Sequence, residues 1–232
     1  MKNYLFKINK LIIAFFWCVG MFSCQNSAKT PFPAYGYEFF PLEIGRYVIY
    51  DVNKTVYNLD GSVSKSNYQL KESVVDRFTS ATRQEMYVLE RYLRNNEAQN
   101  WKIDSVWSAY RTNNQAVRQE NNISFVSLSF PLKENLEWNG NFFNTNSRED
   151  YKLVDLNKPL VINKLNFAKT LKVRQAYNNG NKISLKAKEE IYAENVGIIA
   201  ILDTLISYKQ DGSYVISDGR IISQKVIAFG KN

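Results

Sequence analysis

The sequence has 232 residues, of which 45% are hydrophobic, enough to bury a substantial core within one domain. Its formal net charge is +8, but the basic residues are scattered singly among Asn, Ser and Glu, which argues against a nucleic-acid partner. Histidine is absent, so Ser-His-Asp and Cys-His catalysis and histidine-ligated zinc or iron are excluded in their usual forms. No Walker or Rossmann glycine pattern occurs either, and we expect neither a cofactor nor a metal.

The start of the chain has the pattern of an export signal. A positively charged stretch precedes an apolar run from Leu11 to Phe22, after which the sequence becomes polar. This run has 12 residues, fewer than the roughly 20 that a membrane-spanning helix needs. We therefore predict a signal peptide at residues 1–23. Its removal would leave 27 basic against 22 acidic residues, a net charge of +5.

Both cysteines of the chain, Cys18 and Cys24, lie near this start. The sequence "MFSC" resembles the lipobox of bacterial lipoproteins, in which a small residue, here Ser23, precedes a cysteine that is lipidated and becomes the new N-terminus. Met21 and Phe22 depart from the leucine and the small residue that are usual there. The resemblance implies that acylated Cys24 anchors the protein in a lipid bilayer. The alternative is an ordinary signal and a soluble periplasmic or secreted protein.

The residues after Cys24 bear on location. Gln25 stands where some bacteria place an Asp that retains lipoproteins in the inner membrane, and no acidic pair resembling the surface-export signal of Bacteroidota follows. We therefore expect a lipid-anchored cell-envelope protein on the periplasmic face of the outer membrane. Residues 24–37, with two prolines and a glycine among small polar residues, are predicted to form a lipidated, flexible tether. A single β-rich domain at residues 38–232 is predicted to follow.

The pattern of this domain is that of antiparallel β-structure. Residues 181–193 alternate between apolar and polar side chains, as a half-buried strand requires. Other segments are rich in β-branched and aromatic residues, namely 46–52, 84–93, 101–110, 123–130, 171–177, 198–208 and 220–229. Hairpin turns with Asp-Gly or Asn-Gly are predicted at 59–62, 178–181, 210–213 and 217–220. We predict a mainly β fold with little helix, an antiparallel meander forming a curved sheet, half-barrel, barrel or sandwich.

Two segments share a further pattern. Each begins with Phe-Pro-Leu, at Phe40 and at Phe130, and a residue suited to positive φ, Gly45 or Asn135, follows four residues after the proline. We predict a turn at each of these two residues, and a third structural turn at Gly197 in the later "NVG" sequence.

These motifs also carry a family resemblance. The sequences "FFPLEIGRYVIYDV", the second "FPL" with Trp138, and "EIYAENVGIIAI" resemble a pattern in uncharacterised lipoproteins of Bacteroidota, Y-x-P-L-x-x-G-x-x-W-x-Y followed by Y-A-x-x-V-G-[LI]-[IV]. Val48 stands near the place of the family's first tryptophan. The resemblance spans residues 38 to about 205. It implies a β-rich fold akin to the curved sheets of periplasmic lipoprotein carriers, and it implies no known activity.

The aromatic residues suggest a binding function. A curved sheet lined with aromatic rings is suited to an acyl chain, a hydrophobic peptide or a stacked sugar, and Trp101, Trp107 and Trp138 are the candidate ligand-lining residues. The alternative is that these rings fill the core. Strict alternation places Trp101, Ile103 and Trp107 together on one buried face.

Carboxylates offer the other hypothesis. Glu189, Glu190, Glu194 and Asp203 cluster in sequence around the "NVG" turn, and glycosidases need two acids facing each other across a cleft. Solvated carboxylates at strand edges are the commoner explanation of such a cluster. We therefore predict a non-catalytic envelope lipoprotein that binds a hydrophobic ligand, a glycan or an envelope partner. The alternative function is a carboxylate-dependent glycan hydrolase.

Overall fold

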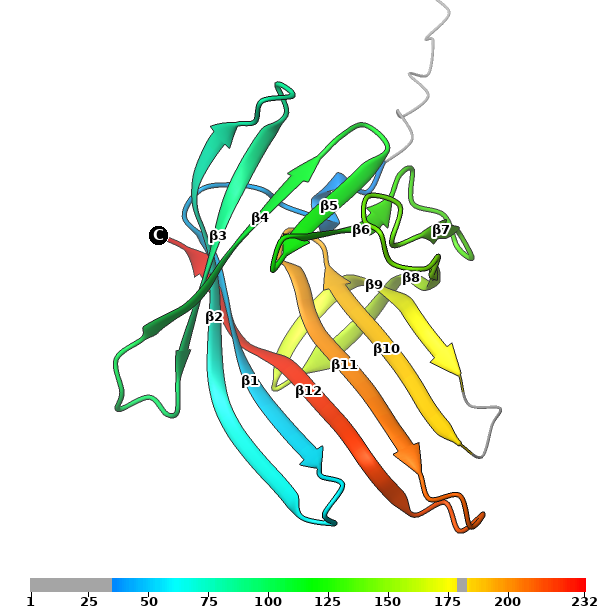
Figure 1. Cartoon of the computed structure of the whole chain (residues 1–232). Helices are drawn as coiled ribbons and strands as arrows, with labels where there is room; N and C mark the ends of the chain where they lie inside the picture. Colours follow the sequence, from blue (N-terminus) through cyan, green and yellow to red (C-terminus); the bar gives the residue numbers. More distant parts are fainter. Residues whose placement is uncertain (1–34, 179–182) are drawn as a thin grey trace, which may run out of the picture. The chain divides into compact units, whose positions relative to one another are not determined.

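The strands of the protein form a strongly curved sheet, shown in Figure 1. The structure is a computed structural model that describes residues 35–178 and 183–232. The predicted signal peptide, both cysteines and nearly all of the tether lie outside these residues. A short 3₁₀-helix, Tyr37–Phe39, precedes twelve strands: β1 (Arg46–Tyr57), β2 (Val63–Thr79), β3 (Glu85–Arg94), β4 (Lys102–Arg111), β5 (Gln115–Glu120), β6 (Ile123–Ser129), β7 (Glu137–Asn139), β8 (Asp150–Ile162), β9 (Leu165–Asn178), β10 (Ser184–Ala193), β11 (Gly197–Tyr208) and β12 (Ile216–Lys231).

All twelve strands belong to one sheet, in the order β6-β5-β4-β3-β2-β1-β12-β11-β10-β9-β8-β7. Strands that are neighbours in sequence pair as antiparallel hairpins, apart from β6 and β7. The pairing of β1 with β12 joins the two halves of the meander. The prediction of a mainly β, antiparallel meander is confirmed. Among the predicted alternatives of curved sheet, half-barrel, barrel and sandwich, the structure is a single curved sheet that curls on itself.

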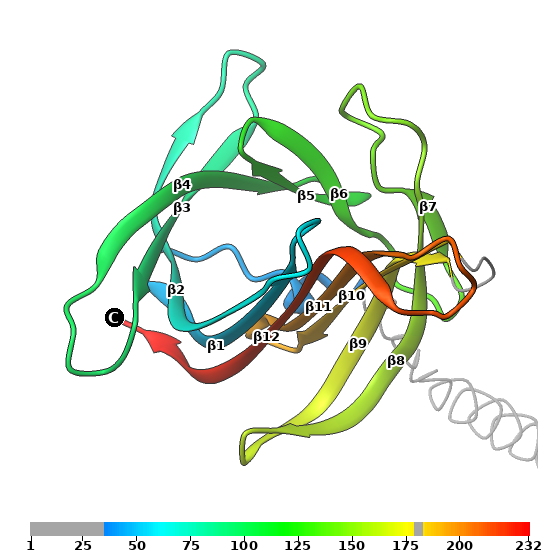
Figure 2. The ribbon, with the colours of Figure 1, turned by 60° about the horizontal axis from the view of Figure 1, so that its bottom comes forward.

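The two edge strands of this sheet meet. The backbone N–H of Val126 in β6 donates to the carbonyl of Gly140, just after β7, at 2.9 Å. The indole N–H of Trp138 in β7 donates to the carbonyl of Val126 at 2.8 Å. Figure 2 shows the resulting curl, with β6 beside β7. These bonds satisfy edge groups that would otherwise be unpaired, so the sheet is nearly closed into a barrel.

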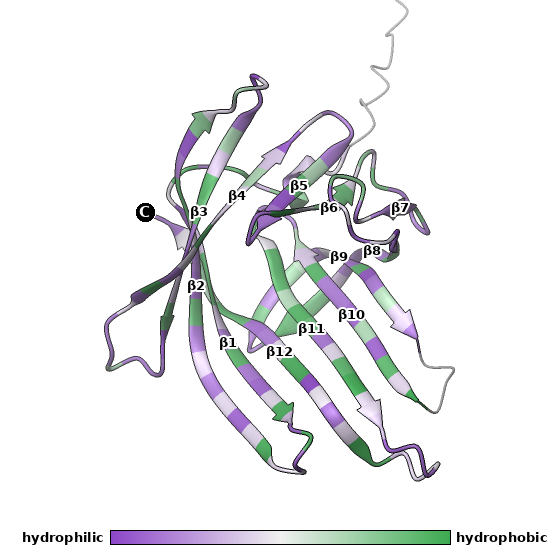
Figure 3. Cartoon of the chain, in the orientation of Figure 1, coloured by the Kyte–Doolittle hydropathy of each residue, from purple (hydrophilic) through white to green (hydrophobic). Residues whose placement is uncertain are grey.

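Alternation along the strands places the core. In β1, for example, Tyr50 and Val52 are buried on either side of exposed Asp51, and Figure 3 shows the same alternation of hydropathy along most strands. The larger core cluster contains Phe39, Phe40, Val74, Leu89, Ala109, Ala116, Val117, Val126, Leu128, Phe130, Trp138, Tyr151, Leu153, Leu171, Val173, Tyr192 and Ile198. A second cluster contains Tyr50, Val52, Leu70, Phe167, Ala193, Ile199 and Val226.

The three turn residues singled out in the sequence all have positive φ. The angles are +91° at Gly45, +62° at Asn135 and +92° at Gly197. The N–H of Gly45 donates to the carbonyl of Val74 at 2.9 Å, so this turn is tied to β2. A β-carbon at Gly45 would lie 2.8 Å from the backbone oxygen of Asn232.

We expect Gly45→Val to lower the free energy of unfolding by about 1–3 kcal/mol, because valine is strained at positive φ and the new side chain crowds the Asn232 backbone. Urea denaturation of the mature domain measures the change. Gly61→Val is the matched control, since Gly61 has φ +83° but a β-carbon there would meet no non-neighbouring atom within 4 Å. A loss at Gly45 no larger than at Gly61 would show that crowding plays no part.

Two of the four predicted hairpin turns join strands as expected, at 59–62 between β1 and β2 and at 210–213 between β11 and β12. The predicted turn at 178–181 lies mostly outside the described residues. The prediction for 217–220 is wrong, because these residues lie inside β12. Gly219 pairs there with Tyr57 and Ile206, and a β-carbon on it would lie 2.2 Å from the Leu205 oxygen. This glycine serves a close backbone approach, not a turn.

The prediction that Ile103 lies on a buried face of β4 is also wrong, because Ile103 is 61% exposed. Arg91 of β3 pairs with Ser105, but the next residue, Tyr92, pairs with Ile103, so Asp104 is an extra residue in β4. Such a bulge reverses the alternation. Ile103 therefore points away from the side occupied by Trp107, which lines an interior cavity.

Candidate ligand-binding cavity

The curled sheet encloses a cavity of about 190 Å³ whose lining is rich in charged side chains. One wall comes from β2, β3, β4 and β5, and the opposite wall comes from β10, β11 and β12. The charged lining residues are Glu72, Arg91, Arg118, Glu120, Lys188, Glu190 and Asp203. Charged side chains are rare in protein interiors unless they are paired, so each of these needs an explanation.

Strand register places the first wall. Glu72 of β2 stands directly opposite Arg91 of β3, and Arg91 stands opposite Ser105 of β4. Trp107 lies two residues beyond Ser105, on the same face of β4. Arg118 lies on β5, the next strand beyond β4, where it pairs in register with Ala109 of β4. The small side chain of Ala109 leaves room for the long guanidinium group beside it.

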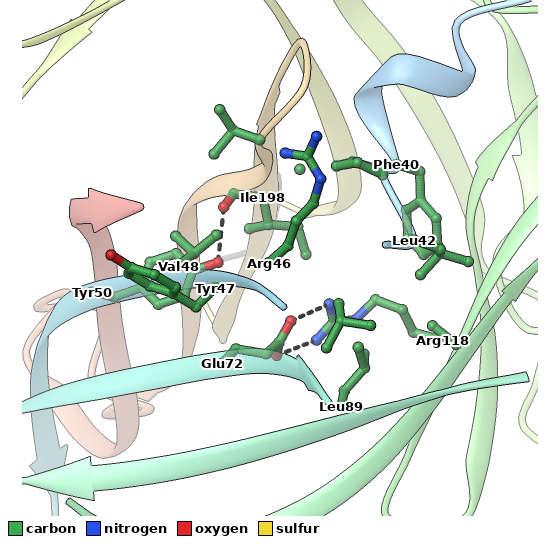
Figure 4. A pocket seen from close by; sticks show the side chains of 15 residues that line it. Phe40, Leu42, Arg46, Tyr47, Val48, Tyr50, Glu72, Leu89, Arg118 and Ile198 are labelled. Atoms are coloured by element: carbon green, nitrogen blue, oxygen red, sulfur yellow. Dashed lines mark hydrogen bonds and ion pairs between the residues drawn. The ribbon is translucent and has the colours of Figure 1, made fainter. Parts of the chain in front are cut away.

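Arg118 and Glu72 form the central ion pair of this wall, shown in Figure 4. The two terminal nitrogens of Arg118 donate to the two carboxylate oxygens of Glu72 at 2.8 Å each, and its Nε donates to Glu120 at 3.0 Å. Burial alone would raise the pKa of Glu72, but the charge and hydrogen bonds of Arg118, with the charge of Arg91, lower it below its ordinary value. Glu72 is therefore a carboxylate at neutral pH.

Arg91 is held differently. Its guanidinium carbon lies 3.7 Å from the centre of the Trp107 ring, a stacked cation–π contact. Its Nε is 3.5 Å from a Glu72 oxygen, too far for a hydrogen bond of normal length. In the described part of the chain, Arg91 Nε and Trp107 Nε1 are both buried donors without a hydrogen-bond partner.

On the second wall, the lining side chains of β10, β11 and β12 form two rows that run across the strands. Glu190 of β10, Ile201 of β11 and Gln224 of β12 stand side by side, and Lys188, Asp203 and Ile222 form the next row. Glu190 is only 4% exposed and accepts a hydrogen bond from the Tyr192 hydroxyl. Burial, followed by the charge of Glu190 and its hydrogen bond, raises the pKa of Tyr192 well above its ordinary value. That hydroxyl therefore stays a donor.

A smaller cavity of about 60 Å³ adjoins the charged one and shares Tyr50, Glu72, Arg118 and Ile198 with it. The rest of its lining is mostly apolar, including Phe40 near the 3₁₀-helix. Figure 4 shows this cavity, with the Glu72–Arg118 pair and the hydrogen bond from the Tyr50 hydroxyl to the Ile198 carbonyl, 2.8 Å long. The ion pair thus separates an apolar end of the interior from a polar one.

The structure does not bring the three predicted tryptophans together. Trp107 lines the charged cavity. Trp138 is 8% exposed and belongs to the core. Trp101 lines a separate hollow with Ile44 and Tyr92, and the guanidinium carbon of Arg94 lies 4.3 Å from its ring centre.

The four predicted carboxylates are also divided. Glu190 and Asp203 line the cavity. Glu189 pairs with Arg174 at 3.4 Å, and Glu194 pairs with Lys169 at 2.9 Å, both away from the cavity lining. Asp203 is itself paired with Arg220 at 3.1 Å.

Sequence reasoning missed Glu72, Arg91 and Arg118. Each is a charged residue in a strand, a pattern that is typical of the solvent-facing side. Alternation in β5 gives no signal either, because Ala116, Val117 and Arg118 are buried in succession. Across residues 35–178 and 183–232, no group of three or more His, Cys, Asp or Glu side chains is placed to hold a metal ion. Nor does any helix in those ranges have the length and apolarity to cross a membrane.

Comparison with known proteins gives no family. No family model matches the chain, and no curated protein matches it. Two solved structures are similar: a predicted exported protein of Bacteroides fragilis with a YmcC-like fold, and a predicted lipoprotein of Parabacteroides distasonis. The first is 13% identical, covers 85% of this chain and 100% of its own length, and has a TM-score of 0.45. The second is 14% identical, covers 83% and 98%, and has a TM-score of 0.40. Similarity this distant assigns no function to this chain.

Proposed function

We propose that this protein is a membrane-anchored lipoprotein of the cell envelope that binds a small ligand inside its curled sheet and catalyses no reaction. The observation that carries the binding proposal is the charged cavity, with the buried donors of Arg91 and Trp107 left without a partner. Replacing a buried ion pair by apolar residues is often neutral or stabilising, so stability alone does not account for charges here. An unpaired buried donor costs about 1–3 kcal/mol, which a bound ligand would recover.

In this proposal the protein holds its ligand firmly, so the complex of protein and ligand should survive gentle purification. Native mass spectrometry of the mature domain, purified from a membrane extract of the native host, is the direct test. We expect a mass above that of the acylated polypeptide, and the excess mass identifies the ligand class. A polypeptide that carries only its lipid, at every extraction condition, would argue against a binding function.

The anchor in this proposal is Cys24, on the periplasmic face of the outer membrane. We expect Cys24→Ser to leave the protein unprocessed or soluble, because no thiol remains for acylation at the Ser23–Cys24 junction. Fractionation of outer membrane and soluble material measures this. Cys18→Ser is the matched control and should fractionate like the parent. If the Cys24 variant stays with the outer membrane, the protein is not anchored through this residue.

A glycan hydrolase remains the second candidate, because two of the predicted acids, Glu190 and Asp203, line the same cavity. Release of reducing ends from host-envelope or dietary glycans by the purified domain, abolished by Glu190→Gln, would favour it. Binding of a glycan that is returned intact would favour the non-catalytic function.

A further inference from the structure

We propose that the charged cavity recognises an acidic sugar, a hydroxyl-bearing ring with one carboxylate, and that Arg91 binds the carboxylate. This inference rests on the proposed binding function and names the ligand class for the same site. It follows from the donors and acceptors that the cavity leaves open and from its size.

The first step concerns the open donors. The guanidinium of Arg91 makes no hydrogen bond within the described residues, although it lines the cavity and its side chain is only 16% exposed. Its stacking on Trp107 fixes the guanidinium plane. A fixed guanidinium presents a fork of N–H donors that matches a carboxylate. The indole N–H of Trp107, on the ring that stacks against Arg91, is a second buried donor without a partner among the described residues.

The second step concerns charge. Arg118 is shared between Glu72 and Glu120, and Asp203 is paired with Arg220. Among the described residues, Lys188 has no ion pair or hydrogen bond from its side chain, and it lines the cavity together with Arg91. Two cations of the cavity lining therefore lack a hydrogen-bonded carboxylate. The lining has four carboxylates against three cations, so a ligand carboxylate would be held by the open donors of Arg91 and Lys188 and not by a net positive charge.

The third step concerns hydroxyl groups. An ionised carboxylate has about four acceptor sites, and the protein fills only one on Glu120, Glu190 and Asp203. The Gln224 side chain also lines the cavity and has no hydrogen bond within the described ranges, so it offers a donor and an acceptor. These acceptors suit hydroxyl donors, whereas a plain acyl chain would leave them unpaired. The ligand therefore needs several hydroxyl groups besides its acid.

The fourth step concerns size. A cavity of about 150 Å³ in another protein holds benzene, so about 190 Å³ is room for one substituted ring. A single uronic-acid-sized ring fits this volume, and a long fatty acid does not. The side chain of Arg118 is 8% exposed and that of Glu120 is 27% exposed, so Glu120 lies nearer to solvent than Arg118.

Titration calorimetry of the mature domain with four probes tests the inference: glucuronate, galacturonate, glucose and hexanoate. We expect at least one uronate to bind at least about tenfold more tightly than glucose or hexanoate, because hydrogen bonds to a charged group contribute about 1.5–3 kcal/mol. Arg91→Gln should weaken uronate binding about tenfold or more, and Trp107→Phe should weaken it several-fold through loss of the indole donor.

Arg94→Gln is the matched control, since Arg94 is on the same strand and also stacks on a tryptophan, but outside this cavity. Arg94→Gln should leave uronate binding unchanged. Melting curves of all variants test whether each one is folded. Should Arg91→Gln prove unfolded, Trp107→Phe and the probe series decide in its place. Glucose or hexanoate binding as tightly as the uronates, or a folded Arg91→Gln that binds like the parent, would overturn the inference.

The outcomes also separate this inference from the proposed function. If none of the four probes binds, but protein from the native host retains another small molecule, the acidic-sugar inference is overturned and the binding function stands. If no probe binds and no small molecule is retained, both are overturned.

Discussion

We expect Glu72→Leu to lower the free energy of unfolding by about 3–5 kcal/mol, the usual result of removing one partner of a buried ion pair. Arg118 is 7% exposed and would lose both bonds from its terminal nitrogens, keeping only its bond to Glu120. The loss arises from buried Arg118 donors left without a partner more than from the missing attraction. Urea denaturation of the mature domain measures it.

The double variant Glu72→Leu, Arg118→Met tests this explanation, because it removes both charges together. We expect it to be more stable than the single variant but less stable than the parent, because Glu120 loses its bond from Arg118 and Arg91 loses the Glu72 carboxylate. The surface pair of Arg77 and Glu85, 2.9 Å apart with side chains 59% and 49% exposed, is the control, and Glu85→Gln should change stability by less than about 1 kcal/mol. A double variant as unstable as Glu72→Leu would refute the role of the unpartnered Arg118 donors.

The same pair gives the stability a dependence on pH. The folded protein holds the pKa of Glu72 below the ordinary value of 4.5, so the carboxylate contributes stability above about pH 4.5. This contribution is lost as the pH falls through the lower, folded pKa. The stability difference between the parent and Glu72→Leu should therefore shrink as the pH falls below about 4.5.

Trp138→Ala is the second large change, with an expected loss of about 3–5 kcal/mol from deletion of a buried aromatic side chain. Trp138 packs edge-on against Tyr151, with ring centres 6.1 Å apart, and its indole N–H bonds the Val126 carbonyl across the two edges of the sheet. The variant should therefore also loosen the closure of the sheet. Faster hydrogen exchange at the Val126 amide, measured by NMR, would report this.

Two controls separate the contributions at this position. Trp138→Phe keeps most of the ring but removes the indole N–H, so we expect a smaller loss in stability together with faster exchange at Val126. Trp101→Ala removes a tryptophan outside the core clusters and should cost less than Trp138→Ala. Equal losses at Trp101 and Trp138 would contradict the assignment of Trp138 to the core.

The regular part of the fold could be predicted from the sequence because it depends on local pattern. Alternation and β-branched content identify β1, β3, β4, β6 and β9 to β12, and Asp-Gly chemistry identifies the turns at 59–62 and 210–213. β2, β5, β7 and β8 were not identified. In β2 the residues are mostly polar, and its inward-facing Glu72 resembles a solvent-facing residue. The Asp-Gly pattern at 217–220 predicted a turn that is not there, because Gly219 allows a close backbone contact with Leu205 on the neighbouring strand. A contact between strands of this kind is not visible in the local sequence.

The sequence by itself therefore determined a β-rich domain and the places of its main strands, because strand patterns depend on neighbouring residues, whereas the exported, lipoprotein-like start stays a prediction. Only the tertiary structure decided that the sheet curls until β6 meets β7, and that this curl brings charges into its interior. Glu72 and Arg118 are 46 residues apart, and Arg91 meets Trp107 across two strands whose register is set by a bulge at Asp104. Whether a charged residue on a strand faces water or a cavity depends on what the curved sheet encloses, and that is set by pairing between distant strands.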